Sequence, residues 1–359
     1  MTASPQGEAF RFDYTLTDKL QFIVERKKIT MYGYMTFHDK ILNNLIDSVH
    51  NKSASHAYIF EGADGLFLNN CAKLFAAALT CENTSVAPCG SCRSCIQAKA
   101  DTNPDICYIV REKENGKLKK TIGIEPIRNA VKDSQVKPFN APKKVYIIEE
   151  GDLLTTEAQN AFLKTFEEPP EYAVFIIIVQ NSSALLETIL SRGVLVNFPP
   201  VADSIVGKYI EENYPDEKDR LDFLIKYCEG IPGEADKVIG NENFEALREK
   251  SLEMLGIFLV AKPINAFDIQ SFFTENKDDT DMIFDFWISF MRDIVIILCG
   301  IRDNIINSDK FTELQKLTSR TNEAKIIKAI SEILKTKDML ERSVKHSSAI
   351  MHCALAVCD

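Results

Sequence analysis

The sequence lacks any apolar stretch that approaches the roughly 20 residues a helix needs to cross a bilayer. Its most apolar late segment, Phe284 to Ile301, is interrupted by the charged neighbours Arg292 and Asp293. The sequence also shows no secretory signal, which would combine a basic start, a short apolar core and a small-residue cleavage site. We therefore expect a cytoplasmic protein that does not interact with a membrane.

An excess of basic residues is absent as well. The chain has 42 Lys and Arg against 52 Asp and Glu, a formal net charge of −10 at pH 7. This balance argues against a surface coated for nucleic acid, although a local basic patch remains compatible with it. With 45% hydrophobic and 26% charged residues, the 359-residue chain has the composition of a soluble globular protein and the length of two or three domains.

Cysteine, in contrast, is plentiful, and in a cytoplasmic chain its ten copies are expected to be thiols or metal ligands. Four of them follow the pattern C-x7-C-x2-C-x2-C: Cys81, Cys89, Cys92 and Cys95. A C-x2-C step lets two sulfurs bind one ion, and four thiolates satisfy the tetrahedral preference of zinc. We predict a closed, structural zinc module at 81–95. The alternatives are a redox dithiol and an iron–sulfur cluster, although Ile96 replaces the proline that often follows the latter.

Residues 143–179 have the pattern of a strand, an acidic turn, a helix and a second strand. The apolar run Val145 to Ile148 is followed by Glu149 and Glu150, and a second buried strand is predicted from Tyr172 to Val179. Such a βαβ unit predicts a parallel sheet. Carboxylates at the C-terminal end of a central strand lie where open α/β sheets bind ligands, and a solvated turn is the alternative.

A second strand–turn–helix segment resembles a phosphate-binding P-loop in outline only. Aligning Gly62 and Gly65 with G-x-x-x-x-G-K-[ST] places Phe67 at the last glycine, Leu68 at the lysine and Asn69 at the hydroxyl. A working P-loop needs that lysine for the terminal phosphates and the hydroxyl for magnesium. We therefore expect the shape of the loop without its nucleotide site, and a plain strand–helix turn is the alternative.

Arg192 ends a short predicted helix, just before the last predicted strand of the α/β region, Val194 to Phe198. An arginine at this position is either an ordinary helix-end cation or a group directed at the phosphate of a neighbouring subunit. The charged segment 111–120 is predicted to be a hairpin or loop, solvated or in contact with a phosphate backbone.

The rest of the chain predicts helices only. A small helical domain is expected at 201–242 and an all-helical domain at 243–359. Residues 1–34 are interpreted as an N-terminal tail, disordered or not native, and the alternative is that Met31 or Met35 is the natural start. Apolar stripes in the last domain are interpreted as core, among them Ile326, Ile327, Ile330, Ile333 and Leu334.

Taken together, these motifs resemble the bacterial DNA polymerase III clamp-loader subunits, which are AAA+ proteins. HAYIFEG, the four-cysteine insertion, KKVYIIEE, NAFLKTFEEPPEYAVFIII and ILSRG occur in the order and spacing of that family. The likeness is strong over about 35–201 and extends to the helical remainder in layout only. The family has an ATPase branch, the gamma and tau subunits, and a largely ATP-silent branch, the delta prime subunits.

The chain is more similar to the silent branch because its P-loop-like turn has lost its functional groups. Glu149 replaces the magnesium-binding aspartate of the family, and its extra methylene would misplace the carboxylate. The sensor arginine of the family would fall near Gly233 or Glu234, where this chain has no arginine. Gly193 departs from the usual Ser-Arg-Cys, but Arg192 is kept.

The resemblance implies an AAA+ domain at 35–200, a helical lid at 201–242 and a collar domain at 243–359. It implies that this chain binds no ATP and that Glu149 and Glu150 form a Walker B-like pair. It also implies that the four cysteines hold a structural zinc ion. It also implies a pentameric ring with the gamma/tau and delta subunits, in which Arg192 acts on the ATP of a neighbour. The ring would act on the sliding clamp and primer–template DNA, and DNA polymerase activity would belong to the whole complex.

Two other functions are compatible with parts of the sequence. An active AAA+ ATPase of the gamma/tau type would hydrolyse ATP with magnesium as an isolated chain, and the missing lysine argues against it. A zinc-dependent DNA-binding module would bind DNA alone with a steep salt dependence, and the negative net charge argues against it.

Overall fold

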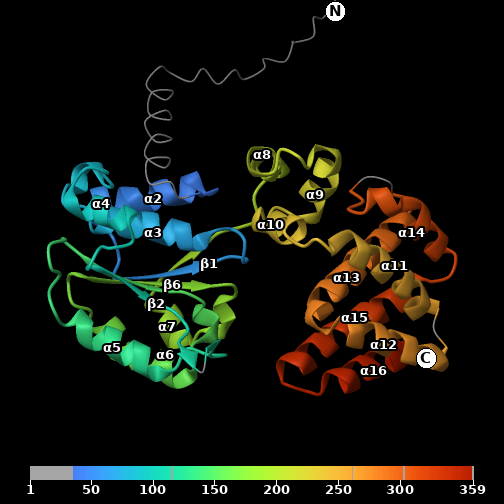
Figure 1. Cartoon of the computed structure of the whole chain (residues 1–359). Coiled ribbons are helices and arrows are strands. Elements are labelled where there is room, and N and C mark those ends of the chain that lie inside the picture. The colour runs from blue at the N-terminus through green and yellow to red at the C-terminus, as the bar shows by residue number, and fades with distance from the viewer. Residues whose placement is uncertain (1–34, 115, 261, 302–303, 358–359) are drawn as a thin grey trace, which may run out of the picture. The chain divides into compact units, whose positions relative to one another are not determined.

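The computed structural model describes residues 35–114, 116–260, 262–301 and 304–357 (Figure 1). The chain divides into two compact units, Met1–Val201 and Ala202–Asp359. The interpretation of residues 1–34 as a tail lies outside the described residues. Among the described residues, no helix is long and apolar enough to span a membrane.

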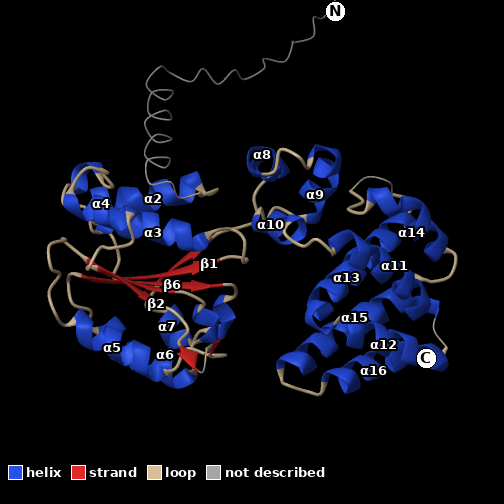
Figure 2. Cartoon of the chain, in the orientation of Figure 1, coloured by secondary structure: helices blue, strands red, loops and turns tan. Residues whose placement is uncertain are grey.

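The first unit is built on a five-stranded parallel sheet, as predicted (Figure 2). The strand order is β2-β5-β6-β1-β7. Their bounds are β1 Ala57–Glu61, β2 Ile106–Ile109, β5 Lys144–Ile148, β6 Ala173–Val179 and β7 Val194–Asn197. β5 and β6 are buried along their whole length, because helices cover both faces of the sheet, and this explains their continuous apolar sequences.

Six helices cover the two faces of this sheet. One face is covered by α2 (Asp39–His50), α3 (Leu68–Leu79) and α4 (Arg93–Lys99), and the other by α5 (Ile124–Ser134), α6 (Thr156–Glu167) and α7 (Glu187–Leu190). The hydroxyl of Thr155 caps α6 by accepting a hydrogen bond from the Ala158 N–H at 3.2 Å. Phe162 and Phe166 of α6 then pack with Phe175 of β6 in the core.

Short elements complete the unit. The charged segment predicted as a hairpin or loop forms an antiparallel hairpin of β3 (Lys113–Glu114) and β4 (Lys117–Leu118). Single 3-10 turns lie at η1 (Thr84–Val86), η2 (Gly151–Leu153) and η3 (Ser182–Ala184).

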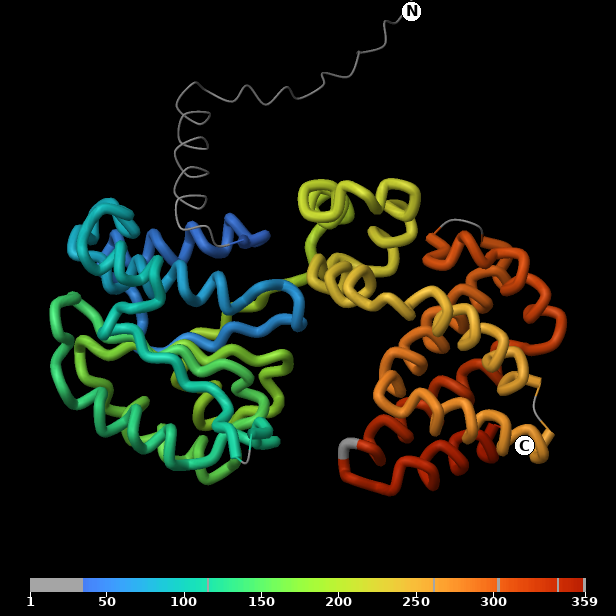
Figure 3. Tube along the Cα trace, in the orientation of Figure 1, coloured from blue at the N-terminus to red at the C-terminus, as the bar shows by residue number. Residues whose placement is uncertain are grey.

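The second unit is helical throughout its described residues, as predicted (Figure 3). Its α-helices are α8 Asp203–Asn213, α9 Leu221–Tyr227, α10 Gly233–Ile239, α11 Phe244–Val260, α12 Ala266–Glu275, α13 Thr280–Leu298, α14 Phe311–Thr318, α15 Glu323–Glu341 and α16 His346–Val357. The 3-10 turns are η4 Lys218–Arg220, η5 Pro263–Asn265, η6 Lys277–Asp279 and η7 Ser308–Lys310. The buried Trp287 packs on Phe258 and Phe273, at ring-centroid distances of 4.6 and 5.2 Å. The finer division into 201–242 and 243–359 stays a prediction.

One apolar stripe in this unit was predicted wrongly in part. Ile326 and Ile333 of α15 are fully buried, but Ile327 and Leu334 are 58% and 54% exposed. The helix turns Ala329 and Thr336 toward the core instead, at the three- and four-residue spacing of one helix face.

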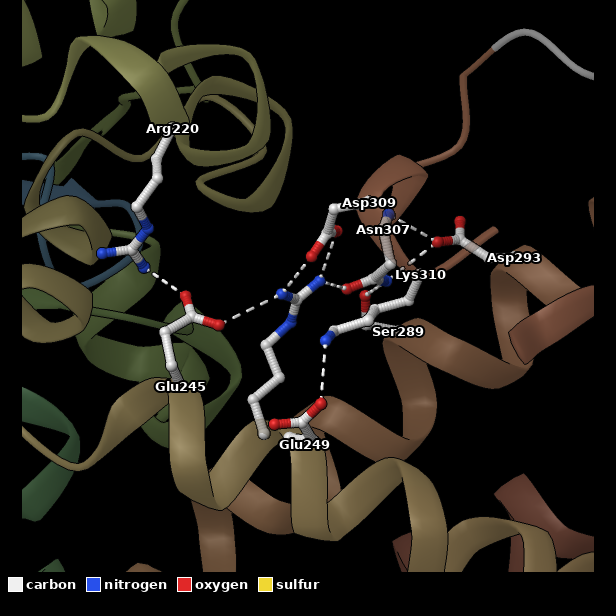
Figure 4. A network of polar contacts seen from close by, with 9 residues as sticks. Arg220, Glu245, Glu249, Ser289, Asp293, Asn307, Asp309 and Lys310 are labelled. Carbon is white, nitrogen blue, oxygen red and sulfur yellow. Dashed lines mark hydrogen bonds and ion pairs between the residues drawn. The ribbon is translucent and has the colours of Figure 1, made fainter. Parts of the chain in front are cut away.

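A buried polar network joins helices of the second unit (Figure 4). Arg248 of α11 is 1% exposed and donates to both carboxylate oxygens of Asp309, each at 2.8 Å, and to the Asn307 Oδ1 at 2.8 Å. Its guanidinium also lies 4.1 Å from the ring centre of Phe223 in α9. The fully buried Asp293 accepts hydrogen bonds from the backbone N–H and the side-chain amide of Asn307, both at 2.8 Å.

Candidate functional site

The P-loop-like turn keeps its glycines for reasons of backbone geometry. A Cβ atom at Gly62 would lie 2.9 Å from the Phe198 carbonyl oxygen, so a side chain there would clash with backbone. Gly65 has a φ of +92°, a conformation that side chains with a Cβ rarely adopt. The backbone of this turn therefore requires glycine at both positions, as the backbone of a phosphate-binding loop does.

The three positions that would contact a nucleotide carry other side chains. Phe67 adopts the left-handed conformation, with φ of 56°, at the position of the last P-loop glycine, and its ring packs edge-on against Phe37 at 5.6 Å. Leu68, at the lysine position, is 5% exposed, and its Cδ1 lies 3.3 Å from where a Cβ of Gly62 would be. The place of a phosphate-binding ammonium group is thus taken by a buried apolar side chain.

The third position, Asn69, lies close to the acidic end of β5. Its side chain is near enough to the carboxylate of Glu149 to affect the pKa of that group, so the structure brings together the two positions that would share a magnesium ion. Burial raises the pKa of Glu149, the neighbouring charge of Glu150 raises it further, and the nearby Lys73 and Asn69 side chains oppose this shift. The carboxyl group of Glu149 is therefore harder to ionise than an exposed glutamate.

The second carboxylate of the Walker B-like pair is held by an arginine that the sequence did not single out. Arg111 donates from Nε and one terminal nitrogen to the two oxygens of Glu150, at 2.6 and 2.7 Å. This bidentate pair raises the pKa of Arg111. The two residues follow β2 and β5, which pair in register at Ile109 and Ile148. The pair forms because β2 and β5 are neighbours in the sheet, which the spacing of these residues along the chain does not show.

Arg192 lies outside this cluster, and its hydrogen-bond partners belong to α6, to α7 and to Ser191, which follows α7. One terminal nitrogen donates to the Thr188 carbonyl at 2.9 Å and to the Ser191 hydroxyl at 3.3 Å, and the other donates to a carboxylate oxygen of Glu167 at 2.8 Å. The side chain nevertheless stays 33% exposed. The guanidinium is therefore oriented by its own chain and still open to an anion from outside it.

The backbone after Arg192 is fixed by a close contact with the sheet. A Cβ atom at Gly193 would lie 2.9 Å from the Cδ1 of Ile59, which is fully buried in β1. Val194 then begins β7 by pairing with Tyr58 of β1. The glycine that departs from the Ser-Arg-Cys pattern is thus explained by the isoleucine that it faces.

The four predicted cysteines come together as one cluster. The sulfurs of Cys81, Cys89, Cys92 and Cys95 all lie within 4.8 Å of one another. The sulfurs of Cys89 and Cys95 are 3.9 Å apart, close to the roughly 3.8 Å that a tetrahedral site with zinc–sulfur bonds of about 2.3 Å requires. Backbone N–H groups of Cys92 and Cys95 point to the sulfurs of Cys89 and Cys92, each at 3.4 Å. The residues present therefore fit a four-thiolate metal site.

We expect the purified chain to carry about one zinc ion, because four converging thiolates satisfy zinc completely. Metal analysis by mass spectrometry checks this, with Cys92→Ser expected to lose the metal. Cys299→Ser is the matched control, because Cys299 is exposed and lies outside the cluster. Iron in place of zinc, or a metal-free wild-type protein purified without chelators, would contradict the assignment.

Comparison with known proteins gives two family matches. The family described as DNA polymerase III, delta subunit, matches residues 37–202, and the family described as DNA polymerase III, delta subunit, C terminal, matches residues 242–347. The matches cover parts of both compact units.

Curated relatives agree with these matches. Subunit delta′ of DNA polymerase III from Bacillus subtilis is 26% identical over 321 residues, which cover 88% of this chain and 94% of that protein. Subunit delta′ from Pseudomonas aeruginosa is 30% identical over 203 residues, covering 56% of this chain and 60% of that protein. The tau subunit of Bacillus subtilis is 33% identical over 172 residues, covering 47% of this chain but 29% of that longer protein.

Proposed function

The chain belongs to the clamp-loader delta′ family of DNA polymerase III, and from that premise we propose that it does not hydrolyse ATP and supplies Arg192 to a neighbouring subunit. The observation that carries this proposal is the contrast between the two ends of the candidate site. The P-loop-like turn holds a buried Leu68 where a lysine would be needed, whereas Arg192 stays partly exposed with its guanidinium oriented.

The chemistry of phosphoryl transfer explains how such a chain contributes to catalysis. Charge develops on the transferred phosphoryl group, and an arginine from a neighbouring subunit stabilises it in many nucleotide-hydrolysing enzymes. A guanidinium is always charged and presents N–H donors in a planar fork that matches phosphate oxygens. Arg192 would act in this way on ATP bound by an adjacent gamma or tau subunit.

The proposed assembly contains the gamma/tau ATPase subunits and the delta subunit, and it loads the sliding clamp onto primed DNA in the bacterial cytoplasm. The parallel sheet and the helical second unit support an AAA+ domain at 35–200 followed by a lid at 201–242 and a collar at 243–359. The four-cysteine module would hold a structural zinc ion, because a closed set of four thiolates leaves no position for a substrate.

An active ATPase of the gamma/tau type is the main competing function, and the site geometry argues against it. Leu68 supplies no charge to the phosphates, and Asn69 replaces the hydroxyl residue that would bind magnesium. Glu150, the remaining carboxylate, is paired with Arg111 through both oxygens. Each group that would bind, activate or position a nucleotide is thus replaced or engaged elsewhere.

Equilibrium titration of the isolated, zinc-loaded chain with a fluorescent ATP analogue tests the silent site. We expect no binding into the high micromolar range, with or without magnesium, because the lysine contact is lost. A gamma or tau subunit titrated in the same buffer is the positive control. Tight, magnesium-dependent binding to the isolated chain would overturn the proposal and favour the active ATPase.

A further inference from the structure

Glu167 is the only residue among those described that gives Arg192 an ionic partner. It is the last residue of α6, and its carboxylate accepts a hydrogen bond from the guanidinium at 2.8 Å while remaining 54% exposed. We infer that Glu167 is a positioning residue, which holds one edge of the Arg192 guanidinium so that its other N–H groups face the phosphate of a neighbouring subunit. This inference rests on the proposed function of Arg192.

The position of Glu167 is unfavourable for the helix that carries it. The C-terminal end of a helix has a partial negative charge, so a carboxylate there is unfavourable unless a cation compensates it. Glu167 and Glu168 both lie at this end of α6. Of these two carboxylates, Glu167 is the one whose charge a cation compensates, through its ion pair with Arg192.

The two side chains are brought together by the core rather than by their own attraction. Phe166, next to Glu167, is 2% exposed, and Ile189, three residues before Arg192, is fully buried. The N–H group of Arg192 also donates to the Ile189 carbonyl at 3.1 Å. Because both backbones are anchored in one core, the ion pair needs no ligand or partner to form.

The contacts of the guanidinium leave donors available. The three hydrogen bonds to Thr188, Ser191 and Glu167 use the two terminal nitrogens, and Nε has no hydrogen-bond partner among the described residues. A guanidinium has five N–H groups in a rigid plane. Holding one part of this plane therefore orients the remaining N–H groups, as a second residue often does for a catalytic side chain.

The test is a double-mutant cycle in the reconstituted complex of this chain with gamma/tau and delta, measured as ATP turnover stimulated by clamp and primed DNA. Glu167→Ala is expected to lower the maximal rate about two- to fivefold, the range of an exposed ion pair, with the ATP concentration for half-maximal rate unchanged. In an Arg192→Ala background, Glu167→Ala should cause no further loss, because the group that it positions is gone.

Glu168→Ala is the matched control and should behave as wild type, since its exposed side chain makes no hydrogen bond or ion pair to the described residues. A wild-type rate for Glu167→Ala, or the same loss with and without Arg192, would overturn the inference and leave the proposed function standing. An Arg192→Ala complex with full activity would instead remove the proposed function itself.

Discussion

Replacing Arg248 by alanine is expected to lower the free energy of unfolding of the second unit by about 2–5 kcal/mol, the range for truncating a large buried side chain. The substitution removes the partner of the half-exposed Asp309 and of the Asn307 side-chain oxygen. It also leaves a cavity beside Phe223, whose ring the guanidinium covers at 4.1 Å. The loss therefore combines packing with unpaired polar groups.

Chemical denaturation followed by tryptophan fluorescence measures this loss in the relevant unit. Trp287 is the only tryptophan of the chain and is buried in the second unit, so its emission reports on that unit alone. Arg220→Ala is the matched control, with an expected change of about 0–1 kcal/mol, because Arg220 is one third exposed in its pairs with Glu217 and Glu245. A change of similar size in both variants would contradict the central role of Arg248.

The same network should respond to acid in a defined direction. Burial acts to raise the pKa of Asp309, but the hydrogen bond and charge of Arg248 outweigh it and hold the pKa below the ordinary value of 3.8. A carboxyl group with a lowered folded pKa adds stability above its unfolded pKa, and this stability is lost as pH falls toward the folded value. The Arg248→Ala protein should therefore lose less additional stability than wild type below about pH 4.

The parallel sheet could be predicted because the sequence features that indicate its strands lie within short continuous segments. The run from Val145 to Ile148 and the run before Val179 are continuous and apolar, which is typical of strands buried on both faces. The four-cysteine cluster could be predicted for the same reason, since Cys89, Cys92 and Cys95 lie within one turn and a short helix. Spacing along the chain was sufficient in both cases.

The contacts that decide the chemistry of the candidate site could not be predicted from spacing. Arg111 and Glu150 are 39 residues apart and Glu167 and Arg192 are 25 apart, and each pair forms only because the sheet and its helices bring chain segments together. The prediction that the apolar residues of α15 form core failed for a different reason, because Leu334 is apolar but lies on the solvent side of its helix. An apolar residue is permitted on a surface, so its presence alone does not define the core.

The Arg192→Ala substitution in the reconstituted complex is expected to have the second large effect. It tests most directly the central claim that Arg192 acts on the ATP of a neighbouring subunit. Every other group that would process ATP in this chain is replaced or engaged, so the catalytic contribution that we propose rests on this guanidinium. At the neighbouring ATP site on which we propose that Arg192 acts, we expect hydrolysis to fall about 10³-fold or more, the range for an arginine supplied from a neighbouring subunit. Clamp loading onto primed DNA should fall with it.

Two further variants make the result specific. Arg192→Lys should recover little, because an ammonium group is a point charge without the planar fork that matches phosphate oxygens. Arg128→Ala is the matched control, since Arg128 is an exposed arginine of the same unit that pairs only with Glu125 among the described residues, at 3.0 Å. Assembly of each complex is checked by gel filtration before its activity is compared.

The deciding measurement is thus single-turnover ATP hydrolysis, together with clamp loading, by complexes that contain wild-type or Arg192→Ala chain. The account predicts an assembled Arg192→Ala complex that hydrolyses ATP at the adjoining site about 10³-fold more slowly and loads the clamp poorly. An assembled Arg192→Ala complex with the hydrolysis and loading rates of wild type would contradict it.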